Sequence, residues 1–250
     1  MAINFQFDSY LIYLSFNILN TFICLLIIRG TKNIVDPIPY PVMAIGNFDG
    51  VHVGHQTLFC KTAELALAHG GTSIAFTFEP HPLKIIAPGK APPLLTHFKK
   101  KMELIESCGV NMVICADFTR KFADQQPRDF SRNILFEKIA VKEIVVGFDY
   151  AFGRGREGTI PYLKKMGEEF GFQVHVVEPF KLKGHTVSSS HVRELIEAGQ
   201  VESASQFLGR DYSIIGPVIS GYKTGQAIGF PTANIDTSKV QIPGTGVYAV

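Results

Sequence analysis

The residues best suited to chemistry lie between Gly46 and His55, in the sequence Gly-Asn-Phe-Asp-Gly-Val-His-Val-Gly-His. Its three glycines allow the backbone to bend and to approach a ligand closely. His52 and His55 are three residues apart, so they fall on one side of a helix that begins there. The free N–H groups of a helix N-terminus attract anions, and two imidazoles would add donors aimed at the same anion. The pattern therefore predicts a phosphate site.

Two simpler interpretations of this turn remain open. It could be a glycine-rich turn with two solvated histidines. It could also be half of a metal site, because zinc accepts the spacing His-x-x-His. No cysteine or acidic pair nearby offers the other ligands that zinc needs, so we favour the anion site.

The turn joins a predicted strand to a predicted helix. The apolar run Val42–Ile45 precedes it, and apolar residues recur at helical spacing over Gln56–Ala68. The same alternation continues, with further strands predicted at Thr72–Phe78, Asn111–Ala116, Glu143–Val146 and Gln173–Val177. Further helices are predicted at His97–Cys108, Pro127–Ala140, Thr159–Phe170 and Ser189–Ala198. Continuous apolar strands between amphipathic helices indicate an α/β fold with a parallel sheet covered on both faces, whose ligands bind at the carboxyl ends of the strands.

A proline-rich loop, Glu79-Pro80-His81-Pro82, follows the second of these strands. The two prolines stiffen the loop, and His81 could donate a hydrogen bond or stack on a ring. A plain loop interrupted by prolines is the alternative. Because the loop follows a strand, it has access to the same crevice.

A glycine-rich loop over Gly147–Gly158 follows the fourth strand. Its glycines at 153, 155 and 158 match Gly-x-Gly-x-x-Gly, and Glu178 lies about twenty residues further on, as in a dinucleotide-binding turn. That fingerprint needs its first glycine in the turn that leaves the strand, whereas six residues intervene here. We therefore favour another role for this loop.

Three serines and an arginine open the last predicted helix. Residues 187–193 read Val-Ser-Ser-Ser-His-Val-Arg. Serines cap a helix and offer hydroxyl donors, and Arg193, one turn into the helix, can contact two phosphate oxygens at once. Taken alone, the pattern is equally typical of a plain cap with a surface arginine.

After Leu208 the pattern changes to short strands and turns, which indicates a second unit. Gly216–Thr224 nearly matches a phosphate-binding P-loop. However, Tyr222 places one residue too many before Lys223, and an extended segment follows instead of a helix. We therefore reject a P-loop there.

Composition and charge favour a small ligand. The 250 residues suffice for one large domain, or for one domain and part of another. The net charge is +2 and no basic block occurs, so a nucleic acid is not expected as a partner. The cysteines form no Cys-x-x-Cys pair and lie in or beside apolar stretches, which is typical of reduced thiols in the cytoplasm. They are Cys24, Cys60, Cys108 and Cys115.

The first residues are unusual for such a fold. Residues 9–28 carry no charge and are nearly long enough to span a membrane. A secretory signal is not favoured, since Asp8 takes the place of a basic region and no small-residue cleavage site follows. A membrane anchor would leave the rest of the chain cytoplasmic, because Arg29 and Lys32 follow it. The alternative is that residues 1–25 are an apolar extension foreign to the fold.

The turn Gly46–His55 resembles the Gly-x-Phe-Asp-Gly-x-His-x-Gly-His signature of the bacterial bifunctional riboflavin kinase/FAD synthetases, nucleotidyltransferases that carry His-x-Gly-His. Four further segments resemble motifs of this family in the same order. They are residues 79–82, 147–153, 187–193 and the run Gly-Phe-Pro-Thr-Ala-Asn at 229–234. Ser190 stands where many members have threonine, and Val192 replaces an isoleucine. The resemblance covers the chain from Ile28 onward.

This resemblance implies a Rossmann-like FMN adenylyltransferase domain over residues 26–205, followed by part of a β-barrel riboflavin kinase over residues 206–250. The implied reaction transfers AMP from ATP to FMN, with Mg²⁺, and gives FAD and pyrophosphate. Kinase activity would be lost through truncation, because the remaining strands of the barrel and its catalytic acid would be missing. A non-catalytic remnant is one alternative, and an adenylyl- or cytidylyltransferase for another phosphorylated small molecule is the other.

The resemblance also implies roles for single residues. His52, His55 and Arg193 would be catalytic, the histidines by stabilising charge on the α-phosphate. The residues expected to bind the nucleotide are Gly46, Asn47, Phe48, Asp49, Gly54, Asp149, Ser189 and Ser190. His81 and Phe152 would lie near the flavin and its phosphate. A metal of the kinase part would be held by Thr232 and Asn234. The sequence predicts no oligomeric state.

Overall fold

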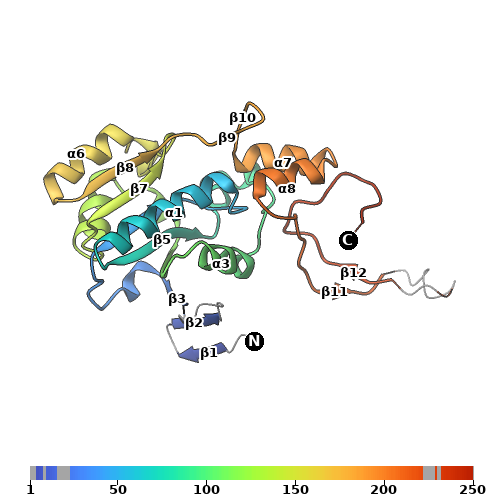
Figure 1. Ribbon diagram of the computed structural model, residues 1–250, viewed down its shortest axis with the longest axis horizontal. Helices are drawn as coiled ribbons and strands as arrows, with labels where there is room; N and C mark the ends of the chain where they lie inside the picture. The colour runs from blue at the N-terminus through green and yellow to red at the C-terminus, as the bar shows by residue number, and fades with distance from the viewer. Residues whose placement is uncertain (1–3, 8–9, 16–22, 222–228, 230–231, 250) are drawn as a thin grey trace.

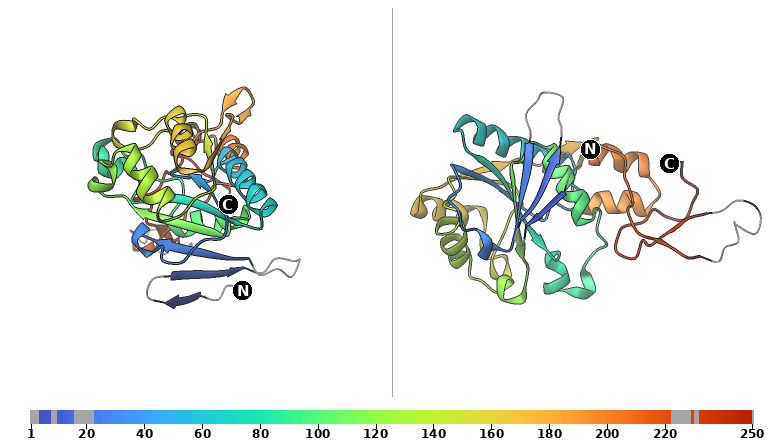
Figure 2. Two further views of the ribbon diagram at one scale, coloured as in Figure 1. Left: turned by 90° about the vertical axis from the view of Figure 1, so that its left-hand side faces the viewer. Right: turned by 90° about the horizontal axis from the view of Figure 1, so that it is seen from below.

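The computed structural model describes residues 4–7, 10–15, 23–221, 229 and 232–249. Its centre is an eight-stranded sheet in the order β1-β2-β3-β6-β5-β4-β7-β8 (Figure 1). Six neighbouring strands are parallel: β3 (Ile23–Arg29), β6 (Met112–Asp117), β5 (Thr72–Glu79), β4 (Pro41–Ile45), β7 (Glu143–Gly147) and β8 (Gln173–Val177). The strands β1 (Asn4–Phe7) and β2 (Tyr10–Ser15) extend one edge in antiparallel pairing, as Figure 2 shows. The α/β fold with a parallel sheet is therefore confirmed.

Helices cover both faces of this sheet. The first face packs against α1 (Val53–Ala68) and α3 (Phe98–Ser107), with Phe59 and Ile105 fully buried. The second face packs against α5 (Pro127–Phe130), the π-helical segment η3 (Ser131–Phe136) and α6 (Ile160–Phe170). The single helix predicted at 127–140 is therefore wound more widely from residue 131, which lets Phe130, Ile134, Leu135 and Ile139 all face the core.

The strand β3 is an addition to the predicted strands, and the predicted boundary after residue 25 falls inside it. Leu25 and Ile27 are both fully buried and contact the α1 face of the sheet. The apolar stretch 9–28 that resembled a membrane span contains β2 and β3 where the structure describes it. Within the described residues, no helix has the length and apolar character that crossing a membrane requires. The domain limits stay a prediction.

The order of the strands places two loops at a topological switch point. From β4 the chain moves outward through β5 to β6, and it then returns to build β7 and β8 on the other side of β4. The loops that leave β4 and β7 therefore diverge from neighbouring strands. In parallel sheets this divergence opens the crevice in which ligands bind.

A third group of elements follows β8. The short hairpin β9 (Lys181–Leu182) and β10 (His185–Thr186) leads to α7 (Ser189–Glu197) and α8 (Val201–Leu208), which bury their own apolar cluster. The C-terminal segment carries a second hairpin, β11 (Val218–Ile219) and β12 (Asn234–Ile235). This segment lies at the end of the molecule opposite α6 (Figure 1). Its contacts with the rest include a bridge between Leu94 and Val240 and a hydrogen bond from the backbone N–H of Gly244 to Ile196 O at 3.3 Å.

The remaining elements are short. They are η1 (Thr31–Asn33), α2 (Pro82–Ile86), η2 (Pro88–Lys90), α4 (Arg120–Ala123) and η4 (Arg154–Arg156). Gly153 precedes η4 and a full helix begins only at Ile160. The Gly-x-Gly-x-x-Gly match thus lies outside the turn that leaves β7, and it lacks the setting of a dinucleotide fingerprint.

Candidate active site

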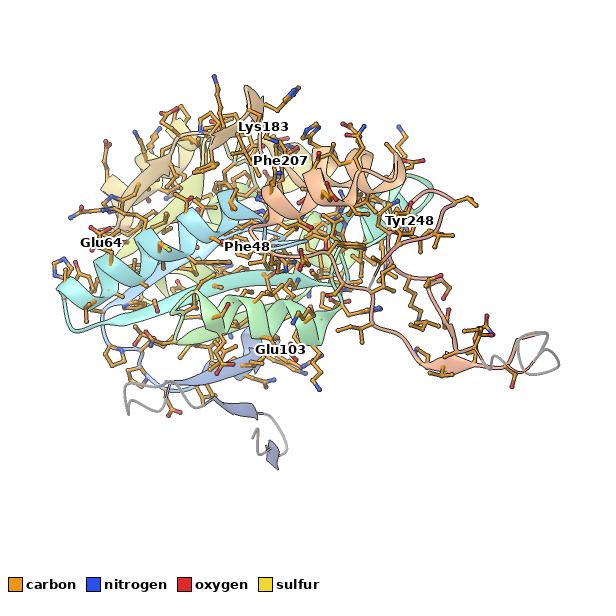
Figure 3. The ribbon with its side chains drawn as sticks, turned by 45° about the vertical axis from the view of Figure 1, so that its right-hand side comes forward. Phe48, Glu64, Glu103, Lys183, Phe207 and Tyr248 are labelled. Carbon is orange, nitrogen blue, oxygen red and sulfur yellow. The ribbon has the colours of Figure 1, made fainter. Side chains whose placement is uncertain are left out.

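The turn that leaves β4 is held in an unusual backbone conformation. Phe48, Gly50 and Val51 all have positive φ, at 52°, 83° and 42°. A Cβ on Gly50 would come within 2.8 Å of the Leu95 side chain, so this position needs glycine for space as well as for its φ. Phe48 is 1% exposed and packs on Phe59, and it lies in the middle of the molecule beside α1 in Figure 3. The buried phenyl ring anchors the turn to the core.

Asp49 ties this turn to two other parts of the chain. Its carboxylate accepts hydrogen bonds from the backbone N–H groups of Leu95 and Thr96, at 3.0 and 3.1 Å. It also forms an ion pair with Arg193 of α7, at 2.5 Å. Its carbonyl oxygen accepts a hydrogen bond from Ser189 Oγ at 2.8 Å. Asp49 therefore joins the N-termini of α1 and α7, and its carboxylate is already occupied by protein donors.

The two histidines stand together at the start of α1. His52 is the N-cap, and its Nδ1 accepts a hydrogen bond from the backbone N–H of His55. The imidazole rings stack with centroids 3.6 Å apart and planes inclined by 16°. Gly54 lies against this stack, since a Cβ there would come within 3.3 Å of the His52 ring. The predicted placement of both rings on one side of the helix is thus what the structure has.

Both imidazoles are neutral donors rather than cations. Burial lowers the pKa of His52 to about 4 and the pKa of His55 well below its usual value. Because Nδ1 of neutral His52 accepts a hydrogen bond, its proton must be on Nε2. In His55, Nδ1 is buried and has no hydrogen-bond partner among the described residues. The pair therefore offers N–H groups without a positive charge.

A further functional group beside the turn is Lys101, a buried cation that was not predicted from the sequence. Its side chain donates to the carbonyl oxygen of Asn47 at 3.3 Å and to Thr77 Oγ1 at 3.2 Å. Burial lowers its pKa, and within the described part of the chain it forms no ion pair. The signal was present in the sequence, because Lys101 lies four residues before the core residue Ile105 and so on the apolar face of α3.

A cleft of about 1050 Å³ opens over these groups. All thirteen residues predicted for the transferase part line it: Gly46, Asn47, Phe48, Asp49, His52, Gly54, His55, His81, Asp149, Phe152, Ser189, Ser190 and Arg193. They come from the loops after β4, β5 and β7 and from the start of α7. The structure therefore gathers residues that lie up to 147 positions apart in the sequence at one edge of the sheet.

Several of these residues have defined places on the cleft wall. His81 caps α2 by accepting a hydrogen bond from the backbone N–H of Leu83, and burial lowers its pKa. Phe152 is 8% exposed and packs between Phe130 and Tyr150, so it belongs to the core as well as to the wall. Asp149 and Ser190 are exposed.

Two predicted residues lie elsewhere. Thr232 and Asn234 are exposed and do not line the cleft, and Asn234 begins β12 in the C-terminal hairpin. Figure 3 shows that segment at the outer side of the molecule, where Tyr248 is labelled. In the described part of the chain, no group of three or more His, Cys, Asp or Glu side chains could hold a metal ion.

Two family models match separate parts of the chain. The FAD synthetase family model matches residues 39–191, and the riboflavin kinase family model matches residues 208–250. The chain is 38% identical to the bifunctional riboflavin kinase/FMN adenylyltransferase of Buchnera aphidicola and to that of Escherichia coli K12. Each match covers 90% of this chain and 72% of the relative.

A solved structure also shares the fold. It is titled a macrolide-efflux protein from Streptococcus pneumoniae, and it is 28% identical with a TM-score of 0.77. The superposition covers 90% of this chain and 73% of the other. With the family models and these relatives in agreement, the chain belongs to the bifunctional riboflavin kinase/FMN adenylyltransferase family.

Proposed function

We propose that the cleft transfers AMP from ATP to the phosphate of FMN and releases pyrophosphate. The observation that carries this proposal is the meeting of two helix N-termini, those of α1 and α7, at Asp49. Each N-terminus presents unpaired backbone N–H groups and a partial positive charge, which suits a phosphate chain. The names of the relatives in Buchnera and Escherichia coli supply the chemical identity of the substrates.

In this proposal the histidines act on the α-phosphate. Nε2–H of His52 and the ring of His55 would donate to oxygens that gain charge in the transition state. A positioned donor of this kind is typically worth about 2.7–4 kcal/mol of the barrier. Both imidazoles are neutral when no substrate is bound. They can therefore donate hydrogen bonds to an oxyanion in this buried site without the free-energy cost of removing water from a protonated imidazole.

The departing phosphates would lie against α7. Ser190 is exposed to the cleft. Arg193 donates a hydrogen bond from Nε to the carbonyl oxygen of Pro93 and one from a terminal nitrogen to the carboxylate of Asp49. Its guanidinium has five N–H donors, so the remaining ones are available for the β- and γ-phosphates. Lys101 adds positive charge from below the turn. Direct displacement needs this positioning and neutralisation of charge rather than a protein nucleophile.

Mg²⁺ would accompany ATP in this scheme. It typically keeps several waters and binds substrate phosphates with one or two carboxylates, which fits a cleft whose described residues form no three-ligand cluster. The exposed carboxylate of Asp149, which lines the cleft, would be one candidate ligand. The ion would neutralise charge on the phosphates.

The test is pyrophosphate release from ATP in the presence of FMN. Pantetheine phosphate and nicotinamide mononucleotide serve as alternative acceptors, because related nucleotidyltransferases would use them. Release with FMN alone supports the proposal. Release with another acceptor but not with FMN contradicts it, and no release with any acceptor indicates a non-catalytic protein.

A further inference from the structure

The end of α8 reaches back to the catalytic turn. Gly209 adopts the left-handed conformation, with φ 70° and ψ 17°, and ends the helix. The backbone N–H of Arg210 also bonds back to Ser205, so the chain reverses direction there. A Cβ on Gly209 would lie 3.0 Å from Val53 at the start of α1. The chain at 208–210 thus packs directly on the helix that carries the two histidines.

Arg210 uses this position to hold backbone carbonyl groups. Its guanidinium donates to Gly50 O at 2.7 Å and to Val51 O at 3.3 Å. It also donates to Leu208 O at 3.3 Å. The side chain of Gln56 donates to the same Val51 and Leu208 oxygens. A planar fork with five donors is suited to gather several carbonyls, which a single ammonium group is not.

The segment that Arg210 holds is strained. Val51 has φ 42°, and a β-branched residue rarely adopts a positive φ. Such a conformation persists only where surrounding contacts enforce it, and strain of this kind clusters at functional sites. Val51 directly precedes His52, so the direction in which α1 begins depends on this residue. The two donors on Val51 O are therefore well placed to fix the imidazole pair.

The charge of Arg210 points to the same link. The guanidinium is partly buried and takes part in no ion pair among the residues that the structure describes. A half-buried cation without a carboxylate depends on other acceptors, and the carbonyl oxygens of Gly50, Val51 and Leu208 supply them here. Its field is one of the influences that lower the pKa of His52.

We propose that Arg210 is a positioning residue for adenylyl transfer, through which the riboflavin kinase part of the chain holds the turn that carries His52 and His55. Arg210 lies within residues 208–250, the part that matches riboflavin kinase, whereas the turn lies in the part that matches FAD synthetase. The inference rests on the proposed function of the cleft. It predicts that the transferase half depends on the first residues of the kinase half.

The experiment compares Arg210→Met and Arg210→Lys with the full wild-type chain. Arg132→Met is the matched control, because Arg132 is exposed and pairs with Glu137 on the other face of the sheet. Small misplacements of reacting groups cost up to about a hundredfold in rate, so we expect Arg210→Met to lower kcat by roughly tenfold or more. KM for ATP and for FMN should stay within about twofold, since Arg210 is not among the residues that line the cleft.

A second readout is the titration of His52, followed by NMR of labelled imidazoles without substrate. Arg210→Met should raise the pKa of His52, because a nearby cation is removed. Arg210→Lys keeps the charge but not the fork, so it should keep the wild-type titration and still lose kcat. This titration does not require the protein to be catalytically active. If the wild-type chain transfers no AMP, the proposed function fails, while the link from Arg210 to His52 is still tested.

Two results would overturn the inference. One is a kcat within about twofold of wild type in either variant, where the wild type is active. The other is an unchanged His52 titration in Arg210→Met. If that variant does not fold at the assay temperature, Arg210→Lys decides on kcat alone, because it retains the charge and most of the packing of the side chain.

Discussion

The two ends of α1 carry histidines in opposite surroundings. At the N-terminus, His52 and His55 stack on each other near Lys101, and the carboxylate of Asp49 is already taken by Arg193. At the C-terminus, His69 stacks on Tyr40 and lies 3.4 Å from the buried carboxylate of Glu143.

At the C-terminal end of α1, Glu143 is the partner of all the other polar side chains in the cluster. It accepts from Tyr40 at 3.1 Å and contacts His175 Nε2 at 2.6 Å. The N-terminus of α1, the positive end of the helix dipole, is thus surrounded by cations and neutral hydrogen-bond donors. The C-terminus, the negative end, lies beside a carboxylate whose oxygens already contact protein side chains. The first end has capacity for an anion, and the second has none. The difference separates a binding site from a structural cluster that contains the same residue types.

The largest expected effect compares one histidine from each end. His55→Ala should lower kcat for adenylyl transfer by about a hundredfold or more, because it removes a donor to the transition state. His69→Ala, on the same helix, should leave kcat within about twofold. Steady-state pyrophosphate release measures both, and thermal melting checks that both chains fold. Equal loss in the two variants would show that the helix, not the site, is being perturbed.

Arg193 should affect both binding and stability. Arg193→Ala should raise KM for ATP by roughly tenfold, because a charge-assisted contact to phosphate is lost in the ground state too. It also leaves the buried Asp49 without its cation, which should cost about 3 kcal/mol of unfolding free energy. Urea melts measure the second effect, with Arg132→Ala as an exposed ion-pair control. An unchanged KM would indicate that Arg193 only holds Asp49 in place and does not contact ATP.

Glu143 should show the reverse pattern. Glu143→Ala removes an acceptor that is 2% exposed, so Tyr40 and His175 lose their partner. We expect a loss of about 1–2 kcal/mol of unfolding free energy in urea melts, less than for a fully buried pair, because both histidines at this end are partly exposed. The kcat at a temperature where the variant is folded should not change. A fall in kcat would contradict the structural role of this end.

Local sequence patterns predicted most of the strands and helices, but they did not predict contacts between residues that are far apart in the sequence. Continuous apolar runs gave β4 to β8, and motif residues that follow strands met in one cleft because parallel strands end at one edge. The strand β3 was missed because its apolar composition also suits a membrane span. The helix α8 was missed because it is only eight residues long and carries just four apolar residues, too few to set a clear helical period. Nothing local shows that Asp49 bonds to Leu95, 46 residues away.

The smallest expected effect concerns the unliganded histidine pair itself. The pKa of His52 in the folded chain is about 4, below its usual value near 6.5. A lowered histidine pKa means that the unfolded chain takes up protons first as pH falls, so the linked stability is complete above about pH 6.5 and is lost from there down to about pH 4.

Lowering the pH from about 7 to about 6 should therefore reduce the unfolding free energy by on the order of 1 kcal/mol through the titration of His52 alone. His52→Asn is the reference variant, because asparagine is a good N-cap and can accept the same bond from the backbone N–H of His55 but does not titrate. Urea melts of both chains across this range should diverge, with the wild type losing stability faster. Most carboxylates titrate below this window, which keeps them out of the difference. Parallel curves would mean that His52 is solvated in the free protein. The N-terminal end of α1 would then lack the neutral, buried donors that distinguish it from the Glu143 cluster.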